Sequence, residues 1–435
     1  MRFDIARPDE LGEAELARWR ALQCAGPPPG APGPAPDGPG PVSGGPGPVS
    51  GGPVPTAPVS GGPIPTSPIP GGPALGNPFL APEFTLAVGR FRAGARVAVL
   101  SDGTGIAGFF PYERHALGLG RPIGAGLTDC QGLIGPPDLE FDVRALLRAC
   151  RLSVWEFDHL LADQAAFAPF HAETRVEPVM DLRAGFAAYA EEVRKRSPKT
   201  LKTVRYKERK LGREAGEVTY TFDERDPAEL RRLMAWKSAQ YRRTGRTDRF
   251  AVPWIVALVE HLHETGAGVL SVLRAGGRPV SAHLGLRAGP VMAGWFPAYD
   301  VDFGRYSPGM IGHLRMAEAA AGAGIGWIAM GRGGREYKDW LKNAEFGIAE
   351  GRAARVSAAA GLHWVREAPV RRARSAVLAH PALYAGADRV LRTYARLRPK
   401  GRTAGPTAPV DGAAGHAGAG EGAAGHATVR EGDAA

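Results

Sequence analysis

The sequence has little that would support a disulfide framework, a metal centre or a membrane span. Its three cysteines, Cys24, Cys130 and Cys150, form no CxxC pair, and none has a histidine at metal-ligand spacing. No run of about 18 apolar residues occurs, and the first residues lack the apolar stretch of a signal peptide. We therefore expect a cytoplasmic protein with no metal and no membrane span.

Acidic residues are also scarce relative to basic ones. The chain has 44 Asp and Glu against 54 Lys and Arg, which gives a net charge of +10. This balance favours anionic partners such as nucleotides, coenzyme A, anionic glycans or nucleic acid. Hydrophobic residues make up 44% of the chain, which is ample for packed cores, and its length allows two domains of ordinary size.

Much of the glycine and proline is confined to two segments. Residues 26–76 hold 33 Gly or Pro among 51 positions, with VSGGP beginning at 42, 49 and 59. Proline blocks both helix and strand pairing, and few side chains there could form a core. We predict a disordered insertion, interpreted as a passive linker, with a ligand for a proline-binding module as the alternative. A Gly- and Ala-rich tail at 399–435 is also expected to be disordered.

Outside these segments, the first half of the chain alternates helical and strand patterns, which predicts an α/β domain over residues 1–175. The expected elements are a helix at 9–23, strands at 96–100 and 106–112 joined by a tight turn, a helix at 142–150 and a strand at 152–157. Its few polar candidates, Asp129, Asp158 and His159, are interpreted as surface or turn residues.

The second half, residues 176–398, predicts a larger domain. Helices are expected at 182–193, 194–213, 226–243, 253–263 and between 369 and 396, and strands at 218–222, 269–274, 279–287, 291–297 and 325–331. Short glycine turns join the three strands from 269 to 297 into an antiparallel meander. A helix precedes the last strand, so this strand is expected to run parallel to the third strand of the meander.

The helix at 194–213 is the most basic stretch, with ten Lys or Arg and a single acid, Glu208. Leu201, Val204 and Leu211 are spaced to form its apolar stripe. The positive face is either an ordinary solvated surface or a binding surface for an anionic ligand, such as a polyanionic substrate or tRNA.

A Ser-Pro-Gly sequence opens the helix that follows the meander. Ser307 is a good N-cap, and a helix N-terminus with bare glycines suits a pyrophosphate group. The alternative is an ordinary loop-to-helix junction. The residues expected to bind the cosubstrate are Arg305, Ser307, Pro308, Gly309, Met310 and Gly312.

Residues 177–351 resemble the CelD/BcsL family of GNAT-fold acetyltransferases, which is linked to cellulose and exopolysaccharide biosynthesis. The matching segments are KTLKTVRYKERKL (199–211), WKSAQY (236–241), PVSAHLGL (279–286), WFPAYD (295–300), YSPG (306–309) and GRGGREYK (331–338), with weaker matches at 77–82 and 108–111. The family pattern tends to carry an acid near Met330 and Gly331, and this sequence has none there.

This resemblance implies a fold class of α/β (α+β) type, with two tandem GNAT-like domains whose mixed, mostly antiparallel sheets are flanked by helices, as in FemAB-like relatives. It implies an N- or O-acetyltransferase that takes acetyl-CoA or another acyl-CoA. The acceptor would be a sugar, a polysaccharide precursor or a small molecule with an amine or hydroxyl. Two alternatives stay open: aminoacyl transfer from charged tRNA, and a non-catalytic scaffold in a polysaccharide-synthesis complex. Nucleic acid is expected as a partner only under the first alternative.

Such a reaction needs a base for the acceptor proton and an acid for the leaving thiolate. His283 is the first candidate base, because the ordinary pKa of histidine is closest to neutrality; the alternative is a hydrogen-bonded histidine within the sheet. The other catalytic candidates are Tyr299, Asp300 and Tyr306, for which aromatic packing or a turn role are alternatives. The expected substrate-binding residues are Trp236, Lys237, Tyr241, Trp295 and Lys338.

Overall fold

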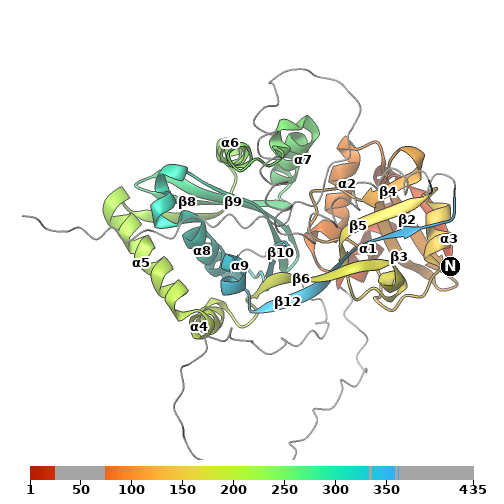
Figure 1. Cartoon of the computed structure of the whole chain (residues 1–435), viewed down its shortest axis with the longest axis horizontal. Coiled ribbons are helices and arrows are strands. Elements are labelled where there is room, and N and C mark those ends of the chain that lie inside the picture. The colour runs from red at the N-terminus through yellow and green to blue at the C-terminus, as the bar shows by residue number, and fades with distance from the viewer. Residues whose placement is uncertain (25–73, 333–335, 358–360, 362–435) are drawn as a thin grey trace, which may run out of the picture. The chain divides into compact units, whose positions relative to one another are not determined.

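A computed structural model of the chain describes residues 1–24, 74–332, 336–357 and 361. These belong to one compact unit, Met1–His363 (Figure 1). Nearly all of the expected insertion at 26–76, the expected helix between 369 and 396 and the tail at 399–435 lie outside the described residues. No helix in the described part is long and apolar enough to cross a bilayer.

The described elements alternate irregularly along the chain. The helices are α1 (Glu13–Cys24), α2 (Pro82–Phe91), α3 (Val143–Ala149), α4 (Phe186–Arg196), α5 (Pro198–Ala215), α6 (Pro227–Arg243), α7 (Pro253–Glu264), α8 (Pro308–Gly322) and α9 (Glu336–Leu341). The strands are β1 (Arg2–Ala6), β2 (Ala95–Asp102), β3 (Gly105–Arg114), β4 (Leu119–Pro122), β5 (Val154–Leu161), β6 (His171–Asp181), β7 (Val218–Glu224), β8 (Gly268–Ala275), β9 (Arg278–Ala288), β10 (Val291–Tyr299), β11 (Trp327–Ala329) and β12 (Ala344–Ala354).

The described strands form one continuous sheet in the order β1-β2-β3-β4-β5-β12-β6-β11-β10-β9-β8-β7. Neighbours are antiparallel except for β4 with β5 and β10 with β11. The expected α/β fold with a mixed, mostly antiparallel sheet and flanking helices is confirmed, as is the parallel strand after α8. Strand β12 lies between β5 and β6 and so joins the two halves of the chain into one sheet.

Two hydrophobic cores lie on opposite faces of the strands that form the second half of the sheet. On one face, Leu270, Leu284 and Trp295 pack in a core that also contains Trp19 and Phe79 from the first half of the chain. On the other face, strand residues pack with residues of α4, α5 and α8, among them Tyr189, Leu211 and Ile311. The first half of the chain and helices α6 and α7 thus cover one face, and α4, α5 and α8 cover the other.

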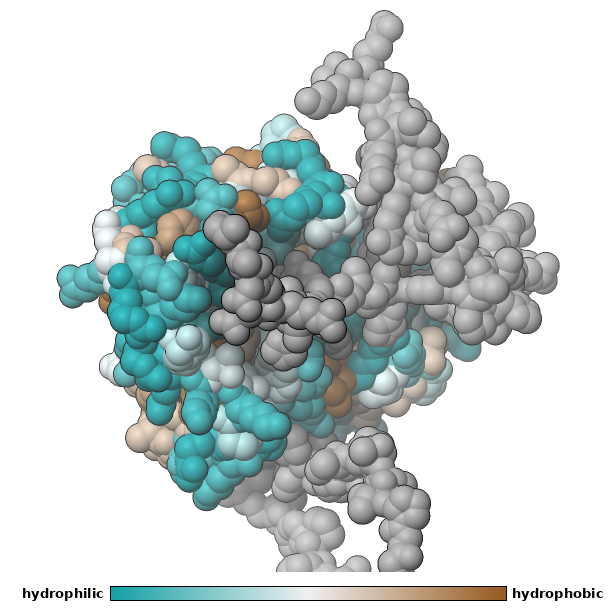
Figure 2. Space-filling view, turned by 60° about the vertical axis from the view of Figure 1, so that its left-hand side comes forward, coloured by the Kyte–Doolittle hydropathy of each residue, from teal (hydrophilic) through white to brown (hydrophobic). Residues whose placement is uncertain are grey.

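Helix α5 has the amphipathic character expected from the sequence. Leu201, Val204 and Leu211 are buried, which confirms the expected apolar stripe. Its basic residues Lys199, Lys202, Arg205, Arg209 and Arg213 are exposed. Figure 2, in which the side of the molecule that carries α5 comes forward, shows a largely hydrophilic surface.

Candidate active site

Strands β10 and β11 pair in parallel at only three positions, from Val291 opposite Trp327 to Ala293 opposite Ala329. Strand β10 continues to Tyr299, whereas β11 ends at Ala329. The pairing of β10 with β9 also shifts register between Gly294 and Phe296, and such a bulge changes the direction of a strand. The two parallel strands therefore stop pairing where β10 bulges, in the middle of the sheet.

The glycine at this bulge has little space for a side chain. A Cβ at Gly294 would lie 3.2 Å from His283 Nε2 and 3.5 Å from the Ala329 carbonyl oxygen. Bare backbone of β10 thus lies between a histidine of β9 and the end of β11. Backbone amides at such a position can donate hydrogen bonds to a carbonyl group in a substrate.

Helix α8 begins after β10 and a short 3₁₀ helix, Val301–Tyr306. The expected hydroxyl cap at Ser307 is wrong. Ser307 has φ 52° and ψ 54°, and its side chain makes no capping bond, because capping requires extended backbone at this position. Its Oγ instead accepts a hydrogen bond of 2.7 Å from Lys207 Nζ. This contact brings a cation of α5 to the N-terminus of α8.

The first turn of α8 has the expected proline and glycines. Pro308 is buried at the first helical position. A Cβ at Gly309 would meet nothing closer than Tyr299 Cδ1, at 3.9 Å, whereas one at Gly312 would lie 3.2 Å from Ser281 Oγ. Met310 is partly buried and packs against the core under α8. Gly309 is therefore the position in this turn with room beside the backbone.

Arg305 and Tyr306 are engaged with one another beside this turn. Tyr306 is 2% exposed, and its hydroxyl donates a 2.6 Å hydrogen bond to Glu214 of α5. Arg305 donates a 2.5 Å hydrogen bond to the same hydroxyl and lies over the ring. The structure therefore gives Tyr306 a role in fixing α8 to α5, while the Arg305 side chain stays largely exposed.

Asp300 and Tyr299 end β10. The Asp300 carboxylate accepts from the Asp302 amide at the start of the 3₁₀ helix and from Arg278 at 2.7 Å. Its place is the cap position that the sequence left as an alternative to catalysis. The ring of Tyr299 lies beside the first turn of α8.

His283 lies on the α8 face of the sheet. Its ring centroid is 5.5 Å from that of His313, and His313 stacks on Tyr337 at 5.2 Å. Burial, followed by the charges of His313 and Lys237, places the pKa of His283 well below its usual value. His283 Nδ1 has no hydrogen-bond partner in the described part of the chain. A histidine with so low a pKa is a weak base. The arrangement therefore favours His283 as a neutral group that binds a ligand over His283 as the catalytic base.

The expected substrate-binding residues are dispersed. The Trp295 indole is 8% exposed, packs in the core and donates a hydrogen bond to the Leu127 carbonyl at 2.9 Å. Its contacts are therefore those of a core residue. Lys237 donates to the Pro297 carbonyl of β10 at 2.9 Å and lies over the ring of Tyr241. Trp236 packs at the edge of the same core as Trp295.

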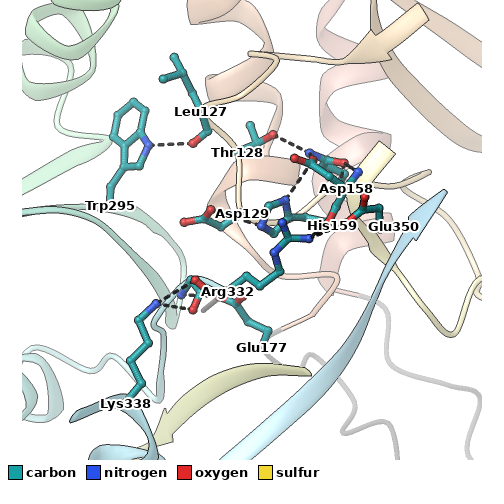
Figure 3. A network of polar contacts seen from close by, with 12 residues as sticks. Leu127, Thr128, Asp129, Asp158, His159, Glu177, Trp295, Arg332, Lys338 and Glu350 are labelled. Carbon is teal, nitrogen blue, oxygen red and sulfur yellow. Dashed lines mark hydrogen bonds and ion pairs between the residues drawn. The ribbon is translucent and has the colours of Figure 1, made fainter. Parts of the chain in front are cut away.

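A network of polar side chains gathers where β5, β6, β11 and β12 meet (Figure 3). At its centre is Gly331, directly after β11, with φ 76°. The Gly331 amide donates to Glu177 Oε1 at 2.5 Å, and the Gly331 carbonyl accepts from Lys338 Nζ at 2.5 Å. A Cβ at Gly331 would lie 2.7 Å from Asp129 Oδ2. Asp129 from the first half of the chain and Glu177 of β6 thus both lie against this glycine.

Glu177 is a carboxylic acid in a buried environment. It is 1% exposed, and its second oxygen, Oε2, has no hydrogen-bond partner in the described residues. Burial, reinforced by the negative charge of Asp129, raises its pKa to about 8. Lys338, His159 and the Gly331 amide act in the opposite direction. A carboxyl group with this pKa can exchange a proton near neutral pH.

The interpretation of the polar candidates in the first half as surface or turn residues is wrong for His159. His159 is 8% exposed, lies 3.0 Å from Asp158 Oδ1 and lies 3.7 Å from Asp129 Oδ1. Although burial opposes it, the hydrogen bond and charge of Asp158 raise the pKa of His159. The side chain of Asp129 is 34% exposed. These residues belong to the network around Gly331.

Lys338 is the one expected site residue that lies in this network. It is 7% exposed, so its ammonium group is buried and is not part of an ordinary surface ion pair. Glu177 was not anticipated. The only signal for it in the sequence is negative. The resemblance led us to expect an acid near Met330, the sequence has none there, and in the structure β6 places a carboxylate against Gly331.

One family of known proteins matches part of this chain. The model of the acetyltransferase (GNAT) domain matches residues 198–339. This stretch is a GNAT-type acetyltransferase domain. It contains β10, β11 and α8, together with Gly331 and Lys338, whereas Asp129 and Glu177 lie outside it. No curated protein matches the chain.

Several solved structures are distantly similar. FemX is 12% identical, with a TM-score of 0.43, over 59% of this chain and 87% of that one. The C-terminal domain of a putative lysylphosphatidylglycerol synthetase from Agrobacterium fabrum is 14% identical, with a TM-score of 0.42, over 65% and 90%. A tandem GNAT protein from the clavulanic acid biosynthesis pathway is 9% identical, with a TM-score of 0.41, over 81% and 98%.

Proposed function

We propose that the protein is an acyl-CoA-dependent acyltransferase. The observation that carries the proposal is the end of parallel pairing between β10 and β11 at Ala293 and Ala329, followed by the glycine-containing start of α8. All of it lies within the stretch that matches the GNAT domain. Separated strands expose backbone donors for a thioester, and a helix N-terminus favours a pyrophosphate.

The residues around the start of α8 fit an anionic cosubstrate. Gly309 leaves room beside the backbone. Lys207 donates a hydrogen bond to Ser307, and the Arg305 side chain is 69% exposed. These groups would hold the phosphates, and the backbone at Gly294 would receive the acyl end. Acyl-CoA supplies the activated acyl carbon, and the chain contributes position and charge. Among the described residues, no cluster of three or more His, Cys, Asp or Glu suits a metal ion.

The proposal extends to the acceptor and the organisation of the chain. We propose a sugar, a polysaccharide precursor or a small molecule as acceptor, in line with the resemblance to the CelD/BcsL family, and a cytoplasmic location. We further propose that residues 1–175 and 176–398 are the two tandem GNAT-like domains, with transfer in the second.

A glycine substitution tests the site at α8. Gly309→Glu places a carboxylate where the phosphates would bind, and the space beside this glycine allows the protein to fold. Gly322→Glu makes the same change at the exposed other end of α8, where nothing lies within 4 Å. Isothermal titration calorimetry with acetyl-CoA and longer acyl-CoAs should show binding for the wild type and Gly322→Glu, and a loss of at least about 100-fold for Gly309→Glu. Equal binding by both variants would rule out this site.

A second candidate is aminoacyl transfer from charged tRNA, which α5 favours. Lys199, Lys202, Arg209 and Arg213 follow one another at helical spacing on its exposed face, with the exposed side chain of Tyr206 among them. A salt-dependent gel shift of charged tRNA, weakened in Lys202→Glu/Arg209→Glu, would support this candidate. Tight acyl-CoA binding without a tRNA shift would exclude it.

A further inference from the structure

Resting on the proposed acyl transfer, we propose that the acceptor is an amine that binds as an ammonium ion at the pair of carboxylates Asp129 and Glu177. The first half of the chain would then supply a substrate-binding residue to the active site of the second half. Asp129 would contact the ammonium, and Glu177, directly behind, would share the proton that the ammonium loses.

The two carboxylates come from distant parts of the chain and meet at one glycine. Glu177 Oε1 accepts from the Gly331 amide at 2.5 Å, and Asp129 Oδ2 lies 2.7 Å from the position of a Cβ on Gly331. Gly331 lies two residues after Ala329, where the pairing of β10 with β11 ends. The pair therefore lies beside the place where the thioester is proposed to bind.

The pair faces the side of the sheet opposite α8. Along β6, side chains alternate between the two faces. Met180 packs in the core under α8, so Val179 and Glu177 point to the other face. Trp295, bonded to Leu127 two residues before Asp129, lies on that face as well. An acceptor at Asp129 would approach the separated strands from one face, while the cosubstrate occupies the other.

A buried oxygen without a partner indicates that a ligand completes this site. Glu177 is 1% exposed, and its Oε2 has no hydrogen-bond partner among the described residues, although an unsatisfied buried oxygen destabilises a folded protein. Burial and the charge of Asp129 raise the pKa of Glu177 to about 8. A nearby ammonium ion would offset both effects.

The charges around the pair favour a cation over a neutral hydroxyl. Asp158 already lies 3.0 Å from His159, and Glu350 lies 3.4 Å from Arg332. For Asp129 the described structure gives only the 3.7 Å approach of His159 Nε2, a nitrogen of the ring that is already held by Asp158. Asp129 is therefore the partly exposed carboxylate of the network with the weakest pairing.

The chemical step balances with the groups at hand. The bound ammonium gives one proton to the carboxylate pair, and its nitrogen forms a bond to the acyl carbon. The carbon–sulfur bond then breaks, and its electron pair leaves on sulfur. The thiolate takes the second proton from nitrogen and departs as the thiol, and the carboxylate pair releases its proton to solvent. The products are an amide, a thiol and one proton.

Matched pairs of acceptors and matched variants test the proposal. The wild type, given acetyl-CoA, should release thiol with at least one amine from the pairs glucosamine and glucose, and putrescine and 1,4-butanediol, but with neither alcohol. Asp129→Asn should lower kcat/KM for that amine at least about 100-fold, with acetyl-CoA affinity within twofold of the wild type. Asp138→Asn, an exposed acid later in the same segment, should behave as the wild type does.

Glu177→Gln separates a proton-transfer role from a structural one. In the wild type, the rate should rise with pH through about 8, because the pair must be ionised to take a proton. The titratable groups that face Glu177 are Asp129, the neighbouring buried thiol of Cys130, His159 of β5 and Lys338 of α9. Glu177→Gln should lose this rise and keep acetyl-CoA binding. An unchanged pH profile, thiol release with the alcohols only, or release with none of the amines would overturn the proposal. If the wild type fails to bind acetyl-CoA, the proposed function itself fails instead.

Discussion

At the scale of single residues, Glu177 shows how a buried acid can be supplied to a sequence motif by a segment that the motif does not contain. The glycine turn after β11 carries no acid, yet its Gly331 amide binds the Glu177 carboxylate from β6. Lys338 holds the other side of the turn through the Gly331 carbonyl. The turn is therefore fixed between a buried acid and a buried lysine. Asp129, which is far from Gly331 in the sequence, lies against the same glycine.

The buried carboxyl group predicts a stability that depends on pH. Because the folded-state pKa of Glu177, about 8, lies above the unfolded value of about 4.5, the wild type loses stability as the pH rises between these values. Glu177→Gln removes this loss. Urea unfolding should show similar stabilities at pH 4.5 and a more stable variant at pH 9, by at most about 5 kcal/mol.

The control for this prediction is Glu173→Gln, an exposed acid on the same strand. Its stability relative to the wild type should not change with pH. If Glu177→Gln is less stable than the wild type at pH 9, the Glu177 carboxylate has stronger partners than the structure shows, and its pKa is not raised.

At the scale of elements, segments with a periodic apolar pattern could be predicted from the sequence. Strands that pair with partners distant in the sequence could not. Helix α5, the meander β8–β10 and the parallel direction of β11 follow from apolar spacing and short glycine turns. Strands β6 and β12 were missed. Pro178 interrupts the pattern in β6, and glycines at 347 and 351 interrupt it in β12. Their pairing is long-range and leaves no local signal.

The candidate site divides in the same way. The start of α8 was found because proline and glycine mark helix starts, although the role of Ser307 was wrong, because a left-handed backbone is not visible in the sequence. Asp129 was named only as a surface or turn residue and Glu177 was not named, because their meeting at Gly331 depends on β6 pairing with β11. Lys338 was found through its motif alone.

Strand β12 supplies a prediction at this scale. A Cβ at Gly351 would overlap the Phe170 carbonyl oxygen and lie 2.8 Å from Phe157 Cζ. A backbone oxygen cannot move aside cheaply, so Gly351→Ala should lower the free energy of unfolding by about 2–4 kcal/mol. Gly322→Ala, at an exposed helical position, should raise it by up to about 1 kcal/mol. Equal stabilities of Gly351→Ala and the wild type in urea unfolding would show that β12 does not pair as described.

At the scale of the described molecule, the two halves share a core as well as a sheet. Phe79 of the first half packs on Trp295 of the second with ring centroids 5.8 Å apart, and the Trp295 indole donates to Leu127. Neither half can separate from the other without exposing these side chains. The halves should therefore unfold together.

This coupling predicts a single transition for the whole chain. Trp19 and Trp155 report on the first half, and Trp295 reports on the second. Tryptophan fluorescence and far-ultraviolet circular dichroism should give coincident urea curves with one midpoint. Two midpoints, or curves that differ between the probes, would show that the halves fold independently. Trp295→Phe, which loses the bond to Leu127, should shift both probes to the same lower midpoint.

The position of β12 also constrains the order in which the chain can fold on the ribosome. Strand β5 leaves the exit tunnel long before residues 344–354 are made, and β12 is its partner along one side. Until then, the nascent chain presents an open strand edge, which readily pairs with other chains. The open edge of β5 is therefore covered only when the final third of the chain has been synthesised. Slow translation through that third should prolong the time for which the nascent chain needs chaperones.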